Sequence, residues 1–226
     1  MDERDCKRGE LRYLDELASR YPQLEECRND ILQGYFILEE CFENGNKLLT
    51  CGNGGSAADS EHIVGELMKS FHIPDHPEVD IVDKLMAIDE NLGQQLAAGL
   101  QHALPAIALS GSPALSTAFL NDCEPLMVFA QQVYGLGLSG DVLLGISTSG
   151  SSKNVAYACV VAKAKGMKVI GLTGKRESVL SRLSDVCVRV PEIETFKVQE
   201  LHLPVYHCWC AMAEERFFGN QSKKIL

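Results

Sequence analysis

Short apolar runs alternate along this chain with longer stretches in which apolar residues recur every three or four positions. The short runs, at residues 47–51, 106–109, 141–146, 168–173 and 186–190, are the expected strands. Nearly continuous apolar strands separated by helices are typical of a parallel sheet covered on both faces. The pattern therefore predicts an α/β fold with a doubly wound, parallel five-stranded sheet.

Helical spacing predicts the elements between the strands. Residues 10–44 carry two apolar stripes separated by Pro22, which indicates an N-terminal helical hairpin. Further helices are expected at residues 57–71, 125–135, 153–165 and 195–218. Pro204 lies inside the last of them and is expected to disturb it, because proline lacks the N–H that the helix needs.

The stretch at residues 72–104 has its own pattern. Residues 72–82 contain Pro74 and Pro77 and are expected to form a loop, and apolar residues at helical spacing then predict one helix over 83–101. No internal repeat or low-complexity tract interrupts the chain, so residues 1–226 are expected to form a single domain.

Composition narrows the functional classes. The chain of 226 residues is 46% hydrophobic and 23% charged, as in a globular protein, and its net charge of −10 without a basic stripe disfavours a nucleic-acid partner. Nine scattered cysteines without a CxxC pair indicate reduced thiols of a cytosolic protein. The charged first residues do not match a signal peptide, and no apolar run approaches the roughly 20 residues of a membrane span. A cytoplasmic location without a membrane partner is therefore expected.

Two loops follow predicted strands and suit a phosphate group. Residues 52–56 read Gly-Asn-Gly-Gly-Ser, and their glycines let the backbone approach a ligand at a helix N-terminus. Residues 147–152 read Ser-Thr-Ser-Gly-Ser-Ser and place five hydroxyl groups at another helix N-terminus. Ligands of open parallel sheets bind at the carboxyl ends of the strands, where both loops are expected. A hydrophilic turn with one capping serine would explain fewer of these hydroxyls.

Two polar clusters lie on predicted helices. His62 and Glu66 are four residues apart and share a helix face, in reach of one metal ion or one substrate carbon. Gln199, His202 and His207 stand on the otherwise apolar last helix. Each cluster has a simpler interpretation as a solvated ion pair or a polar surface.

Together these residues resemble the SIS (sugar isomerase) family, and within it the phosphoheptose isomerases. The resemblance covers about residues 25–218 and lies in the stretches CGNGGSAADSEHIVGEL, NDCEP, GDVLLGISTSGSSKNV, KGMKVIGLTGK and VQELHLPVYH. It implies a flavodoxin-like SIS fold and an aldose–ketose isomerase acting on a sugar phosphate through an enediol. The substrate that the resemblance implies is sedoheptulose 7-phosphate, which is converted to a heptose 7-phosphate.

The resemblance also implies roles for individual residues. Glu66 and His207 match the proton-transfer pair. One zinc ion per subunit is implied at His62, Glu66, Gln199 and His207, held weakly because glutamine is a poor ligand. Substrate contacts are implied for Asn53, Gly54, Gly55, Glu66, Asn121, Asp122, Ser147, Thr148, Ser149, Ser152 and Gln199, the serines and Thr148 holding the phosphate. A homotetramer with sites built from more than one subunit is implied as well.

Residues 72–104 depart from this family because the segment is longer than its counterpart. The inserted loop and helix follow the helix of Glu66, so they could form a lid, a subunit interface or extra scaffold. Because of this insertion, the sequence does not determine which sugar phosphate is the substrate. One alternative is a non-catalytic phosphosugar-binding protein that regulates or binds a partner. Another is an isomerase of pentose or amino-hexose phosphates.

Overall fold

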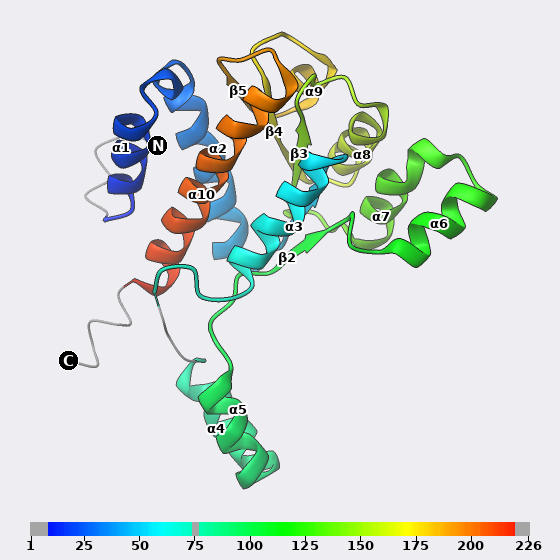
Figure 1. The fold of residues 1–226 in the computed structure, drawn as a ribbon. Helices are drawn as coiled ribbons and strands as arrows, with labels where there is room; N and C mark the ends of the chain where they lie inside the picture. Colours follow the sequence, from blue (N-terminus) through cyan, green and yellow to red (C-terminus); the bar gives the residue numbers. More distant parts are fainter. Residues whose placement is uncertain (1–8, 74–76, 220–226) are drawn as a thin grey trace.

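The computed structural model describes residues 9–73 and 77–219, arranged around one parallel sheet (Figure 1). Its strands are β1 (Leu48–Cys51), β2 (Ala106–Ala108), β3 (Val142–Ser147), β4 (Lys168–Gly174) and β5 (Val186–Val190). They lie in the order β2-β1-β3-β4-β5, and every neighbouring pair is parallel. The predicted doubly wound α/β fold is confirmed.

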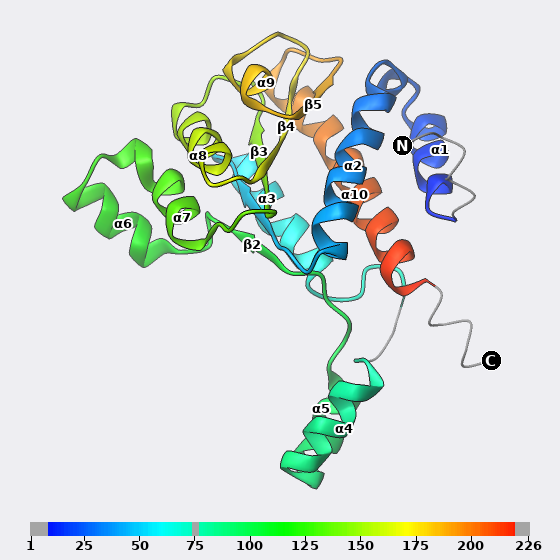
Figure 2. The same cartoon turned by 180° about the vertical axis from the view of Figure 1, so that it is seen from behind.

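Helices cover both faces of the sheet (Figures 1 and 2). One face packs against α2 (Arg28–Glu43), α3 (Gly55–Leu67) and α10 (Thr195–Phe218), with α1 (Leu11–Arg20) outside them. The other packs against α7 (Val128–Leu136), α8 (Lys153–Ala164) and α9 (Val179–Leu183). Strands β1 and β3 are buried along their whole length, which explains their unbroken apolar sequence.

The N-terminal helical hairpin is present, with a short 3₁₀ helix, Pro22–Cys27, between α1 and α2. Sequence patterning missed α9 and α6 (Pro113–Asp122). It also merged a 3₁₀ turn, Pro125–Met127, with α7. Helix α6 has no buried residue, so its apolar positions do not form the single stripe by which amphipathic helices are recognised.

The insertion contains two helices, so the single predicted helix over 83–101 is wrong. Helices α4 (Val79–Ile88) and α5 (Glu90–Gly99) pack on each other and project from the sheet (Figures 1 and 2). Asp89 separates them because its backbone is extended, and its carboxylate accepts the N–H of Leu92 as the cap of α5. The predicted loop also ends earlier than expected, at Glu78, and Pro74 lies outside the described residues.

Helix α10 continues through Pro204, contrary to the expected disturbance. Pro204, Val205 and Tyr206 are buried, and the helix packs on α1, α2, α3 and two strands. This burial holds the helix together although proline removes one backbone hydrogen bond. Gln199 and His207 therefore stand on one regular helix, about 12 Å apart along its axis.

All cysteines that the structure describes are free thiols, and most are buried. Burial raises the pKa of Cys27, Cys41 and Cys159 to about 12, so these thiols stay protonated and unreactive. Among the described helices, none is both long and apolar enough to cross a membrane.

Candidate active site

The two predicted phosphate loops meet at the carboxyl edge of the sheet. Strands β1 and β3 are neighbours, and the chain order reverses between them, where open α/β sheets bind ligands. Asn53 in the first loop and Asn154 at the start of α8 exchange two amide hydrogen bonds of 3.0 and 2.7 Å. The amide pair fixes the two loops relative to each other.

Glycine is required in the first loop for two different reasons. Gly54 precedes α3 with φ +56°, a conformation that residues with a Cβ rarely adopt. At Gly52, a Cβ would lie 2.5 Å from the carbonyl oxygen of Ser56. These turns aim the free N–H groups at the start of α3 outward, toward an anion.

The serine-rich loop, residues 147–152, borders a cavity of about 240 Å³. The hydroxyls of Ser147 and Ser152 lie 2.9 Å apart, whereas Ser149 and Ser151 are exposed. Thr148, Ser149 and Ser151 line the cavity together with Lys175 and Arg176, which follow β4. Hydroxyl donors and two cations thus line one cavity, which Glu177 and Glu192 also line, and the donors and cations suit a phosphate group.

A second cluster lies between α3 and α10. Nε2 of His62 is 3.0 Å from Oε1 of Glu66, and Nε2 of His207 is 3.4 Å from Nε2 of His62. Glu66 also pairs with Lys69 at 3.4 Å. Its side chain is only 15% exposed, so the carboxylate lies in a partly desolvated site beside two imidazoles.

Tyr206 holds the other side of His62. Its hydroxyl lies 3.0 Å from Nδ1 of His62 and donates to Oδ1 of Asp59 at 3.2 Å. Burial raises the pKa of Tyr206, so the phenol keeps its proton, and burial also raises the pKa of Asp59. The Tyr206 hydroxyl and Nδ1 of His62 are therefore in hydrogen-bond contact, and on the other side of the ring Nε2 donates to the Glu66 carboxylate when it carries the proton.

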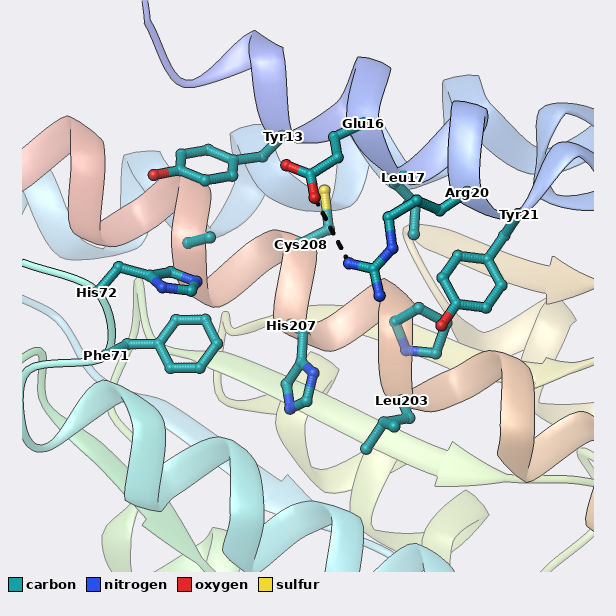
Figure 3. Close-up of a pocket in the computed structure, with 12 residues that line it drawn as sticks. Tyr13, Glu16, Leu17, Arg20, Tyr21, Phe71, His72, Leu203, His207 and Cys208 are labelled. Carbon is teal, nitrogen blue, oxygen red and sulfur yellow. Dashed lines mark hydrogen bonds and ion pairs between the residues drawn. The ribbon is translucent and has the colours of Figure 1, made fainter.

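His207 stands in a second cavity, of about 270 Å³, between α1, α10 and the start of the insertion. Figure 3 shows its ring projecting from α10, with Phe71 and His72 on one side and Arg20 and Leu203 on the other. Burial and then the neighbouring His62 lower the pKa of His207. The imidazole is therefore neutral at neutral pH and can both accept and donate a proton.

Three predicted site residues lie away from these histidines. The amide of Gln199 lies over Gly55, where any Cβ would collide with it. Asn121 and Asp122 end α6, and the Asn121 side-chain amide donates a hydrogen bond of 2.8 Å to the Asp122 carboxylate. Helix α10 passes from Thr195 at the serine cavity, past Gly55 at Gln199, to His207, and so connects both parts of the site.

The donor set at the histidines fits zinc in part. Two imidazole nitrogens and one carboxylate converge, as in catalytic zinc sites with three protein ligands and one open position. The orientation of His62 by Tyr206 matches the supporting hydrogen bonds that metal-binding histidines make. Gln199 does not join them, and within residues 9–73 and 77–219 no preformed metal cluster is found.

Several residues of the site were missed in the sequence. Asn154, Lys175 and Arg176 could have been found, because the first two lie within matched family stretches and the third follows directly. Asp59 and Tyr206 also lie within matched stretches, but their contact with His62 depends on how α3 and α10 pack. Phe71 and His72 lie outside those stretches and gave no signal.

Comparison with known proteins matches the SIS domain model to residues 12–82 and 95–174. The unmatched residues 83–94 lie within α4 and α5. The phosphoheptose isomerase of Aneurinibacillus thermoaerophilus is 37% identical over 80% of this chain and 79% of its own. That of Nitratiruptor sp. is 39% identical over 85% of this chain and 89% of its own.

Solved structures agree with these matches. The phosphoheptose isomerase from Francisella tularensis superposes with a TM-score of 0.66 at 31% identity, covering 91% of this chain and 92% of its own. The one from Neisseria gonorrhoeae has the same TM-score of 0.66 at 29% identity, covering 89% of this chain and 98% of its own.

Proposed function

The chain belongs to the phosphoheptose isomerases of the SIS domain family, and we propose that it interconverts sedoheptulose 7-phosphate and a heptose 7-phosphate. The observation that carries this proposal is the convergence of His62, Glu66 and His207 between α3 and α10. An aldose–ketose isomerisation moves one proton between neighbouring carbons and one between their oxygens, and therefore needs two acid/base groups.

Glu66 and His207 are the two acid/base groups. The partly buried Glu66 carboxylate takes the proton from the carbon beside the carbonyl and returns it to the neighbouring carbon of the enediol. The neutral His207 imidazole moves protons between the two oxygens, because it can donate and accept near neutral pH. Arg20 and His72 line the cavity that contains His207, so their polar side chains lie close to the end of the sugar at which the proton transfer occurs.

The phosphate occupies the other end of the site. Ser147, Thr148, Ser149 and Ser152 supply hydroxyl donors, and Lys175 and Arg176 supply positive charge. Asn53, Gly54 and Gly55 line the sugar between the two ends, beside Gln199. Such an elongated site suits a long sugar phosphate whose reacting carbons lie far from its phosphate.

We propose zinc as the cofactor, held by His62, Glu66 and His207. Gln199, whose amide lies over Gly55, would join them as a fourth and weak ligand only after its side chain turns toward the histidines. When bound, the metal polarises the substrate oxygens and stabilises their negative charge. The chain's own residues support this choice, because Tyr206 contacts Nδ1 of His62 while Nε2 faces Glu66 and His207.

We also propose a cytoplasmic homotetramer. Asn121 and Asp122 are exposed on α6 and reach the sugar only if another subunit brings them there. Apolar side chains exposed on α6 and its neighbours, such as Leu120, Met127 and Tyr134, are consistent with subunit contacts.

One assay tests the proposed function. Purified protein is incubated with zinc and with ketose and aldose phosphates of five, six and seven carbons, and interconversion is followed by NMR. The proposal expects the fastest turnover with sedoheptulose 7-phosphate. Faster turnover of a pentose or amino-hexose phosphate would replace the substrate. Binding of these sugars without turnover would favour the non-catalytic phosphosugar-binding alternative.

A further inference from the structure

Glu214 on α10 is a buried carboxylate with an unusual set of partners. Its side chain is 6% exposed, and it accepts backbone N–H groups from Phe71 at 2.6 Å, His72 at 2.7 Å and Ile73 at 3.2 Å. A buried carboxylate is stable only when such donors replace water. This carboxylate therefore fixes the segment at which the insertion leaves α3.

The same carboxylate holds the other end of the insertion. Nε2 of His102 lies 3.2 Å from Oε1 of Glu214, where a ring N–H donates to it, and the His102 ring stacks on Phe218 with centroids 3.8 Å apart. Two further hydrogen bonds join the ends directly: Ser70 N–H to Gln101 and Leu104 N–H to Leu67. Both ends of the insertion thus meet at one residue of α10.

The fixed segment forms part of the site. Phe71 and His72 line the cavity of His207, with the Phe71 ring 5.6 Å from the His207 ring (Figure 3). Behind it, Glu66, His102 and Glu214 line a small cavity of about 10 Å³. The anchor is therefore adjacent to both members of the proposed acid/base pair, although Glu214 itself does not line the larger cavity.

We propose that Glu214 is a positioning residue for the isomerisation: it anchors both ends of the insertion and thereby holds Phe71 and His72 against His207. The proposal rests on the proposed function, because it assigns Glu214 an effect on that reaction. It gives the insertion a role at the site through its two ends, while α4 and α5 project away from the sheet (Figures 1 and 2).

The test compares Glu214→Gln with Glu215→Gln in the full-length protein. Glutamine keeps the volume of Glu214 but turns one acceptor into a donor, so it cannot accept all four hydrogen bonds. Glu215 is next on the same helix and pairs with Arg12 instead, so it is a matched control. Hydrogen exchange of the Phe71–Ile73 amides and the kcat and KM for sedoheptulose 7-phosphate are measured for each variant.

In Glu214→Gln we expect the three amides to exchange about 10- to 100-fold faster, because hydrogen bonds to a charged acceptor are lost. We expect kcat to fall about 10- to 100-fold, since small misplacements of reacting groups carry costs of this size. KM should stay within about twofold, because the phosphate is held elsewhere. Glu215→Gln should match the wild type in all three quantities.

Unchanged exchange or an unchanged kcat in Glu214→Gln would overturn the proposal, and an equal fall in Glu215→Gln would do the same. If Glu214→Gln does not fold, His102→Leu decides by kcat alone, because it removes one of the four donors to Glu214 and leaves the three amide donors in place. A wild-type protein that turns over no sugar phosphate would contradict the proposed function and the kinetic role of Glu214 with it. The exchange measurement would then judge the anchor alone.

Discussion

The hydroxyl of Tyr206 on α10 lies 3.0 Å from Nδ1 of His62 on α3. This contact orients the imidazole so that Nε2 faces Glu66 and His207. Tyr206→Phe removes only the hydroxyl, and Tyr206 is almost fully buried, so the packing stays the same. Loss of a hydrogen bond that supports a metal ligand commonly costs about 10- to 100-fold in metal affinity or activity.

We therefore expect Tyr206→Phe to reduce kcat and zinc affinity by about 10-fold or more, measured by steady-state kinetics and zinc titration. Tyr157→Phe is the control, because Tyr157 is exposed on α8. A Tyr206→Phe variant with wild-type zinc affinity and wild-type kcat would show that the hydroxyl does not orient His62.

The serine-rich loop makes a prediction about KM. Ser149 is exposed at the cavity that also contains Lys175 and Arg176. A hydrogen bond to a charged phosphate contributes about 1.5 to 3 kcal/mol, so Ser149→Ala should raise KM for the sugar phosphate by at least several-fold. Unfolding by urea should be unchanged, and Ser139→Ala, in an exposed turn, is the control. An unchanged KM in Ser149→Ala would remove this loop from the binding site.

His202 predicts how stability depends on pH. It is fully buried on α10, and burial lowers its pKa from 6.5 to about 4. Between pH 4 and pH 6.5 the His202 imidazole is protonated in the unfolded chain and neutral in the folded chain, so lowering the pH favours unfolding. The free energy of unfolding should lose about 2–3 kcal/mol from this group as the pH falls from 7 to 4.5.

Urea denaturation at both pH values measures this loss. In His202→Phe, which cannot titrate, the decrease with pH should be smaller by about the same amount. An equal decrease in wild type and His202→Phe would assign the acid sensitivity to other groups.

The assembly can be tested by light scattering. We expect four copies per particle at micromolar concentration, and Asn121→Ala should reduce turnover although Asn121 lies on α6, away from the histidines of its own chain. A monomer with full activity would contradict both the homotetramer and a site shared between subunits.

The sequence predicted the sheet well, because its strands are short apolar runs, and the inner strands β1 and β3 are buried along their whole length. It failed where the packing has no periodic pattern: α6 buries none of its residues, and a single extended residue, Asp89, separates α4 from α5 and caps α5. Pro204 was misjudged because burial of α10 outweighs its missing N–H.

Some residues of the candidate site could be recognised in the sequence, and others only in the structure. Asn53, His62, Glu66, Ser149 and His207 were recognisable because they stand in short motifs. Glu214 lies outside the motifs and Tyr206 inside one, but the roles of both arise only when α10 meets α3 and the ends of the insertion. Contacts between residues more than 140 positions apart leave no trace in local patterns.

The central claim is that Glu66 moves a carbon-bound proton. Wild type and Glu66→Gln are incubated with sedoheptulose 7-phosphate in D₂O, with the zinc content of each measured, and NMR follows deuterium at the carbons beside the carbonyl. We expect the wild type to incorporate solvent deuterium during interconversion. Glu66→Gln, with its zinc retained, should do so about 10²- to 10⁴-fold more slowly. Incorporation at the wild-type rate in Glu66→Gln would contradict the role of Glu66 as the base.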